Sequence, residues 1–105
     1  MICLYLENKP ELLSVSRENA LPAQQSQVLE IFSKLDSKEA IILGLLINTQ
    51  TEIKIYPFSR FVWRVEIIKP DTTKQRQLYY STQKVIGLIK DLYQGLDDTN
   101  KSDLH

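Results

Sequence analysis

Four segments rich in apolar, β-branched and aromatic residues follow one another between residues 39 and 81, with only short connections between them. They cover residues 39–48, 52–56, 60–69 and 76–81. Strands joined by short connections pair as antiparallel neighbours, because the chain has room to turn back but not to cross over. The sequence therefore predicts a four-stranded antiparallel meander, and this limits the fold more than any other feature.

The segment RFVWRVEIIK, residues 60–69, shows the clearest two-residue period. One face of the predicted strand carries Phe61, Trp63, Val65 and Ile67, and the other carries Arg60, Val62, Arg64, Glu66 and Ile68. Because the first set is entirely large and apolar, we expect it to face the core. The set that holds the arginines is then expected to face water.

Two helices are predicted on either side of this run, at residues 19–35 and 82–94. In both, apolar side chains recur at spacings of three and four residues, which places them on one stripe of a helix. The stripes are Val28, Ile31, Phe32 and Leu35 in the first helix, and Val85, Ile86, Ile89, Leu92, Tyr93 and Leu96 in the second. Each stripe needs an apolar surface to cover it.

The ends of both helices carry recognisable signals. Asn19 is the expected N-terminal cap of the first helix, with Pro22 in its first turn, where a missing N–H has little effect. Ser81 is the expected cap of the second helix. Gly95 is expected to end that helix in a left-handed conformation.

One face of the predicted sheet is the only sizeable apolar surface available to both stripes. We therefore expect an α+β fold, a two-layer sandwich in which an antiparallel four-stranded meander carries two helices on one face. Whether residues 2–6, ICLYL, add a fifth strand is left open by the pattern. Residues 39–48 are apolar throughout, as in a strand buried on both faces, and Gly44 within them indicates a bulge or a close approach by a neighbouring element.

The length and the composition predict one domain over residues 1–96, followed by a disordered acidic tail at 97–105. The formal net charge is zero, from 13 basic and 13 acidic residues, but the charges are segregated. Residues 1–52 carry 4 basic and 7 acidic residues, residues 53–90 carry 8 and 2, and residues 91–105 carry 1 and 4. The middle of the chain is therefore basic, and both ends are acidic.

The basic segment also holds most of the aromatic residues, and it supplies the candidate binding residues. These are Lys54, Tyr56, Arg60, Arg64 and Arg76. Basic groups that neutralise phosphates, beside aromatic rings on which bases stack, are typical of proteins that bind single-stranded nucleic acids. The same face, or an edge strand, can also recognise a protein. A third interpretation is a solvated basic face that the acidic ends balance.

Catalytic and metal-binding patterns are missing from the sequence. The one histidine, His105, is the last residue, and the one cysteine, Cys3, lies in an apolar run that predicts a buried thiol. A zinc site needs about four nitrogen or sulfur ligands, and this sequence offers only His105 and Cys3. The three glycines are scattered and form no phosphate-binding loop. We expect no enzyme activity, no metal and no cofactor. Without a signal-peptide pattern or a long apolar run, we also expect a cytoplasmic protein that does not enter a membrane.

These observations favour a small, non-catalytic, cytosolic binding or adaptor protein that acts through protein–protein contacts. The stripe of the second helix and the segment at residues 39–48 hold more apolar surface than a small sheet normally covers, which favours self-association as a homodimer or binding to a protein partner. The alternative is a nucleic-acid-binding domain that uses residues 53–90.

Overall fold

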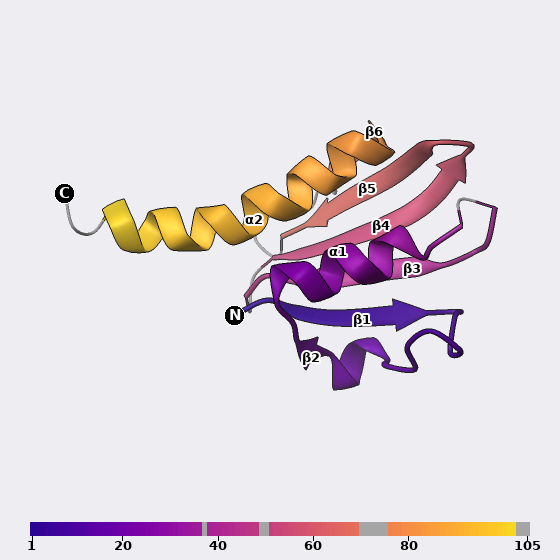
Figure 1. Ribbon diagram of the computed structural model, residues 1–105, viewed down its shortest axis with the longest axis horizontal. Coiled ribbons are helices and arrows are strands. Elements are labelled where there is room, and N and C mark those ends of the chain that lie inside the picture. The colour runs from indigo at the N-terminus through magenta and orange to yellow at the C-terminus, as the bar shows by residue number, and fades with distance from the viewer. Residues whose placement is uncertain (37, 49–50, 70–75, 103–105) are drawn as a thin grey trace.

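The computed structural model describes residues 1–36, 38–48, 51–69 and 76–102, without the side chains of Arg76 and of residues 96–102. The elements are, in chain order, β1 (Cys3–Glu7), the 3-10 turn η1 (Arg17–Asn19), β2 (Leu21–Pro22), α1 (Gln25–Ser33), β3 (Ile42–Leu46), β4 (Glu52–Ser59), β5 (Val62–Ile68), β6 (Arg76–Ser81) and α2 (Thr82–Ser102). Both helices lie over the same side of the strands (Figure 1).

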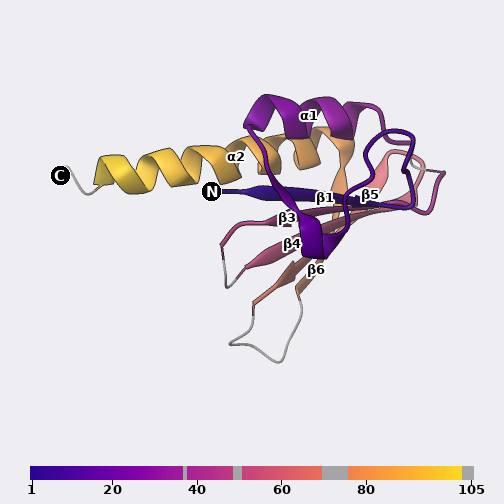
Figure 2. The same cartoon turned by 90° about the horizontal axis from the view of Figure 1, so that it is seen from below.

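The strands form one antiparallel sheet in the order β2-β1-β3-β4-β5-β6. The predicted meander, β3 to β6, is confirmed. The N-terminal strand does join the sheet, since β1 pairs with β3 from Cys3↔Leu46 to Glu7↔Ile42. Figure 2 shows the sheet with α1 and α2 together on one face, and neither of these two helices lies on the other face. The predicted α+β sandwich is therefore confirmed, with six strands in place of four or five.

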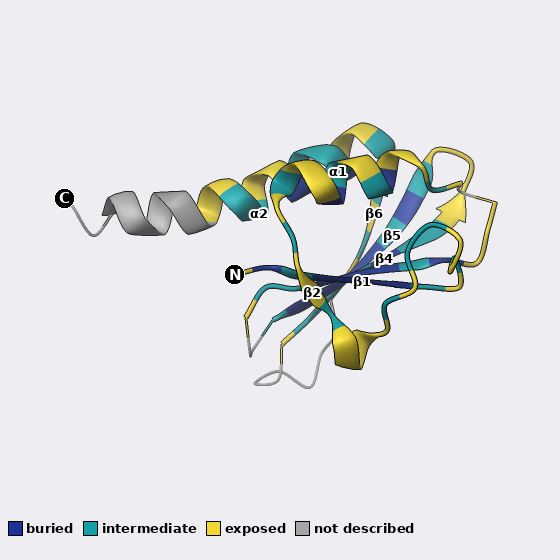
Figure 3. Ribbon diagram, turned by 60° about the horizontal axis from the view of Figure 1, so that its bottom comes forward, coloured by how far each residue is buried: buried dark blue, intermediate teal, exposed yellow. Residues whose placement is uncertain are grey.

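The core lies between the sheet and the two helices, and Figure 3 shows buried stretches along the strands beneath them. Trp63 is only 4% exposed, and its ring centroid lies 4.8 Å from that of Phe32 in α1. The other fully buried side chains of this layer include Leu43, Leu45, Ile55, Val65, Val28, Val85 and Ile89. Burying one such side chain contributes about 1.5–3 kcal/mol. The prediction that the tryptophan side of β5 faces the helices is confirmed.

The start of the first helix was predicted wrongly. α1 begins at Gln25, where the Gln24 N–H donates to the Gln27 side chain at 2.7 Å and the two residues form a capping box. Asn19 ends η1 instead, and Pro22 belongs to β2, the edge strand that pairs with β1. A proline, which has no backbone N–H, fits at an edge because no further strand there needs a donor. Pairing with a distant strand therefore outweighs the local helix-start signal.

The predicted N-terminal cap of α2 is confirmed, since the Lys84 N–H donates to Ser81 Oγ at 3.2 Å. The predicted end at Gly95 is wrong, because α2 continues to Ser102 and no glycine has a positive φ among the described residues. A glycine inside a helix costs only about 1 kcal/mol, and no proline follows it to stop the hydrogen bonding. The disorder predicted for 97–105 stays a prediction. Residues 103–105 lie outside the described residues, and the last turns of α2 project beyond the sheet (Figure 1).

The turn between β4 and β5 also differs from its prediction. β4 passes through Pro57 and ends at Ser59, with a shift in register between these two residues that lets the sheet accommodate the proline. β5 begins only at Val62, so Phe61 lies in the turn with φ 66° and is 66% exposed. The assignment of Phe61 to the buried face is therefore wrong, because its left-handed backbone takes it out of the alternation of the strand.

Candidate functional site

The sheet face away from the helices, here called the open face, carries three of the five candidate residues. The register pairs Lys54 with Glu66, and Arg64 with both Tyr56 and Tyr79. Residues paired across antiparallel strands project from the same face of the sheet. Lys54, Tyr56 and Arg64 are therefore brought together, each of them partly exposed.

The other two candidate residues lie elsewhere. Arg60 is exposed in the β4–β5 turn, with its guanidinium carbon 5.1 Å from the centre of the Phe61 ring. Arg76 pairs in register with Ile67, a position of the set that faces the helices, and its side chain is outside the described part. The five residues are thus divided among three places: the open face, the β4–β5 turn, and a position of β6 that pairs with the helix-facing set of β5.

The charge of Arg64 is largely balanced on the open face. Its guanidinium carbon lies 4.4 Å above the centre of the Tyr56 ring, and one Nη is 3.4 Å from a carboxylate oxygen of Glu66, which is 7% exposed. Burial, and then Glu66, raise the pKa of Tyr56 above its usual value. Because the Glu66 carboxylate offsets the charge of Arg64, the number of basic residues between 53 and 90 overstates the positive potential of this face.

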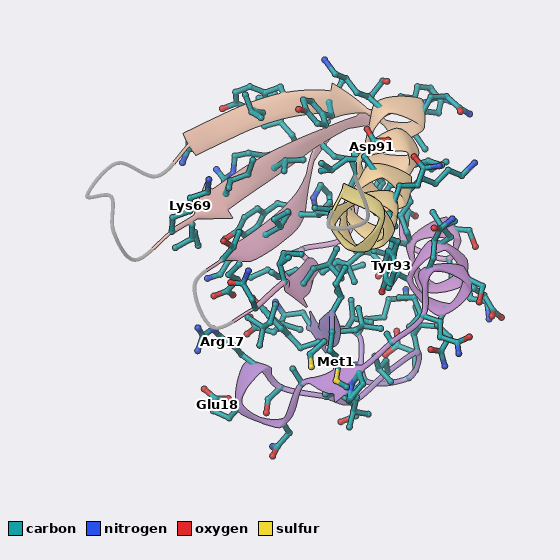
Figure 4. The ribbon with its side chains drawn as sticks, turned by 90° about the vertical axis from the view of Figure 1, so that its left-hand side faces the viewer. Met1, Arg17, Glu18, Lys69, Asp91 and Tyr93 are labelled. Carbon is teal, nitrogen blue, oxygen red and sulfur yellow. The ribbon has the colours of Figure 1, made fainter. Side chains whose placement is uncertain are left out.

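The carboxylate of Glu52, on the same open face, binds two residues of the N-terminal segment. The Tyr5 hydroxyl donates to Glu52 Oε2 at 2.5 Å, and Arg17 Nε donates to Glu52 Oε1 at 2.9 Å. Tyr5 lies flat over Gly44, its register partner in β3, and is 0% exposed. Figure 4 shows Arg17 on the sheet side of η1 and Glu18 on the side away from it.

Sequence reasoning anticipated only part of this arrangement. The close approach predicted at Gly44 is confirmed, with Tyr5 as the neighbour. Neither Glu52, which begins β4, nor Arg17, in a segment without a period, showed a pattern that assigned it a role. Both oxygens of the Glu52 carboxylate are hydrogen-bonded, so this group fastens β1 and η1 to β4 and needs no ligand.

Tyr5 makes the stability of the fold sensitive to high pH. Burial, and then the hydrogen bond to Glu52, raise the pKa of Tyr5 above the value of about 10 that an unfolded tyrosine has. Above about pH 10 the unfolded chain releases a proton that the folded chain retains, so the free energy of unfolding falls as pH rises, by up to about 1.4 kcal/mol per pH unit. Below that pH this contribution is fully present.

We therefore expect Tyr5→Phe to flatten the alkaline loss of stability, measured by urea unfolding between about pH 8 and 11. Tyr56 and Tyr93, whose pKa values burial also raises, are present in both proteins, so the difference in slope isolates Tyr5. Equal slopes for the two proteins would show that Tyr5 keeps no proton on folding.

The helix side of the molecule holds a groove of about 600 Å³ between α1, α2 and the β4–β5 turn. Its apolar lining comes from Leu29, Phe32, Leu35, Phe61, Trp63 and Ile86, and its polar lining from Ser33, Asp36 and Thr82. A concave, mostly apolar site with a few polar groups is the usual form of a binding pocket. The sequence patterns assigned Phe32, Leu35, Phe61, Trp63 and Ile86 to buried faces and gave Leu29 no place, and the groove was not predicted.

Two features of the groove are set by specific contacts. Trp63 Nε1 donates to Thr82 Oγ1 at 3.0 Å, which fixes the indole ring between the two helices. Phe61 lies at the mouth of the groove, largely exposed and in a left-handed conformation that a bulky residue rarely adopts. A strained backbone conformation costs stability, and residues that keep one are found most often at functional positions.

The described residues contain no group of three or more histidine, cysteine or acidic side chains that could hold a metal ion. Among the helices of the same described part, none is both long and apolar enough to cross a membrane. Comparisons of the chain with protein-family models, with curated proteins and with solved structures find no match. The geometry of the two faces is therefore the basis for a functional proposal.

Proposed function

We propose that this chain is a small, non-catalytic binding protein of the cytoplasm, and that its groove between α1 and α2 takes an apolar or aromatic side chain of a protein partner. Phe61 is the observation that carries the proposal. A large ring is held exposed at the mouth of an apolar groove, on a backbone that disfavours it.

The groove suits a protein partner better than an isolated polar substrate. Its volume admits one or two large side chains, and binding energy at protein interfaces concentrates in such buried aromatic and aliphatic anchors. The Phe32–Trp63 pair gives it a rigid floor, because both rings are buried and the indole N–H is already bonded. Phe61 then covers a docked side chain from the solvent side.

The test uses peptides selected against the protein from a random displayed library, with binding followed through Trp63. As the chain's single tryptophan, Trp63 reports groove occupancy directly by its fluorescence. We expect Phe61→Asn to weaken the selected peptides by about tenfold. The same change should raise the free energy of unfolding by about 1 kcal/mol, since asparagine tolerates the left-handed conformation that phenylalanine does not.

Phe58→Asn is the matched control, because Phe58 is also a largely exposed aromatic residue, at 58%, but has no positive φ and lies on the open face. It should leave peptide binding unchanged and should not stabilise the fold. Selected peptides that bind Phe61→Asn as tightly as the original chain would place recognition outside the groove.

A second candidate function is nucleic-acid binding by the open face. The specific observation is the pair of exposed rings Phe58 and Tyr79, with centroids 4.7 Å apart, on the face that carries Lys54 and Arg64. Exposed rings beside basic groups can stack on bases. This function predicts binding to single- or double-stranded oligonucleotides that weakens steeply with salt and is reduced by Lys54→Glu together with Arg64→Glu, the two basic residues of the open face. Absence of binding at low salt would dismiss it.

A further inference from the structure

The two edges of the sheet are built differently. The β2 edge is only two residues long, contains Pro22, and continues into the single bridge between Leu6 and Val15. Short edge strands and edge prolines are devices by which proteins prevent pairing with another chain. The β6 edge spans six residues, and from Gln77 to Ser81 it contains neither a proline nor a charged residue.

β6 is the last strand of the sheet, so it pairs with β5 on one side only within the described residues. Figure 4 shows it at one edge of the sheet, with no further part of the ribbon beyond it. The backbone N–H and C=O groups on the outer side of β6 point away from β5. An unprotected edge of this kind is a template for a further strand.

We propose that β6 pairs with β6 of a second copy of this chain, antiparallel and about a two-fold axis at Tyr79, so that one continuous sheet runs through a homodimer. This inference is independent of the proposed groove function. A two-fold axis makes every contact occur twice, so the strand has to be complementary to itself. The sequence RQLYYS meets this condition in one register.

In that register each type of residue meets a suitable partner. Leu78 lies opposite Tyr80 of the partner subunit on the helix side, and Gln77 lies opposite Ser81 of the partner subunit on the open face. Tyr79 lies opposite Tyr79 of the partner subunit, and the paired segments 77–81 contain no charged residue. Aromatic and aliphatic pairs directly across antiparallel strands are among the contacts that stabilise a sheet. A shift of the axis to Leu78 would instead place Arg76 opposite Tyr80 of the partner subunit.

The exposed rings next to the axis add apolar surface for the second copy to cover. Tyr79 is 54% exposed and contacts Phe58, which is 58% exposed. Pairing at Tyr79 joins the two Phe58–Tyr79 pairs into one aromatic patch across the junction. Because an axis perpendicular to the sheet keeps its faces, both helix layers lie on the same side, and each groove, between α1 and α2, stays open.

Sedimentation equilibrium of the full chain tests this proposal. The original chain should show a monomer–dimer equilibrium, and Tyr79→Lys and Tyr79→Glu should each weaken the dimer by about tenfold or more, because like charges then meet at the axis. An equimolar mixture of Tyr79→Lys and Tyr79→Glu should restore dimerisation, since opposite charges then face each other. Only a residue that lies opposite itself gives this result.

Leu21→Lys is the matched control, because Leu21 is 53% exposed and lies on the other edge strand. It should leave the dimer unchanged. Urea unfolding of each variant shows whether the fold is retained, which is expected because Tyr79 is exposed in the monomer. A monomer at all concentrations up to about 1 mM would overturn the proposal, and so would dissociation by Leu21→Lys, or a mixture that dimerises no better than its components.

Discussion

Gly44→Ala is expected to destabilise the fold by about 3 kcal/mol, although it adds only one methyl group. A Cβ at this position would lie 1.9 Å from Tyr5 Cζ and 2.0 Å from Tyr5 Cε1, distances at which the ring has to move. Adding a methyl group to a closely packed site costs about 1–3 kcal/mol. Displacing Tyr5 also separates its hydroxyl from Glu52, and leaving a buried polar group unpaired costs about 1–3 kcal/mol more.

The same mechanism predicts strong coupling between the two residues. In a Tyr5→Ala background the space above Gly44 is free, so Gly44→Ala should cost less than about 1 kcal/mol there. Urea unfolding of the four proteins of the cycle measures this difference. Gly87→Ala is the matched control: nothing lies within 4 Å of a Cβ at Gly87 in α2, so the change should stabilise the fold by up to about 1 kcal/mol. An equal cost of Gly44→Ala in both backgrounds would contradict the contact.

The elements that the sequence predicted well are those decided by near neighbours. The alternation over residues 60–69 placed Trp63 against the helices, and Ser81 was identified as a cap three residues before the N–H that it accepts. The errors lie where a distant segment decides. Leu21 and Pro22 pair with β1, which the helix-start signal at Asn19 does not reveal. Gly44 indicated a close neighbour, but only the register of β1 on β3 identifies it as Tyr5.

The candidate site was predictable to the same extent. The two-residue period puts Lys54 and Tyr56 on one face of β4, and the register adds Arg64. The ion pairs Arg64–Glu66 and Arg17–Glu52 depend on side-chain conformation and on a segment without a period, so a count of charges along the chain could not show that they balance. Phe61 was misplaced because a single left-handed residue ends the alternation and carries no sequence signal in a phenylalanine.

Trp63→Ala is the second change with a large expected effect, and it links the fold to the groove. Trp63 is 4% exposed, contacts the Phe32 ring and donates a hydrogen bond to Thr82. Replacing a buried tryptophan by alanine costs about 3–5 kcal/mol, through lost contacts and the cavity that remains. Because Trp63 also lines the groove, this cavity opens into a site that a ligand can enter.

Indole should therefore bind Trp63→Ala and restore part of its stability, by about 1.4 kcal/mol at an indole concentration ten times the dissociation constant. Thermal unfolding with and without indole measures the effect. Val65→Ala is the control, since Val65 is fully buried on the same strand but does not line the groove, and its cavity should give no response to indole. Rescue confined to Trp63→Ala means that an aromatic ring reaches the floor of the groove from solvent, as the proposed recognition of a partner side chain requires. Equal responses of the two variants, or none, would mean that the groove gives a ring no access.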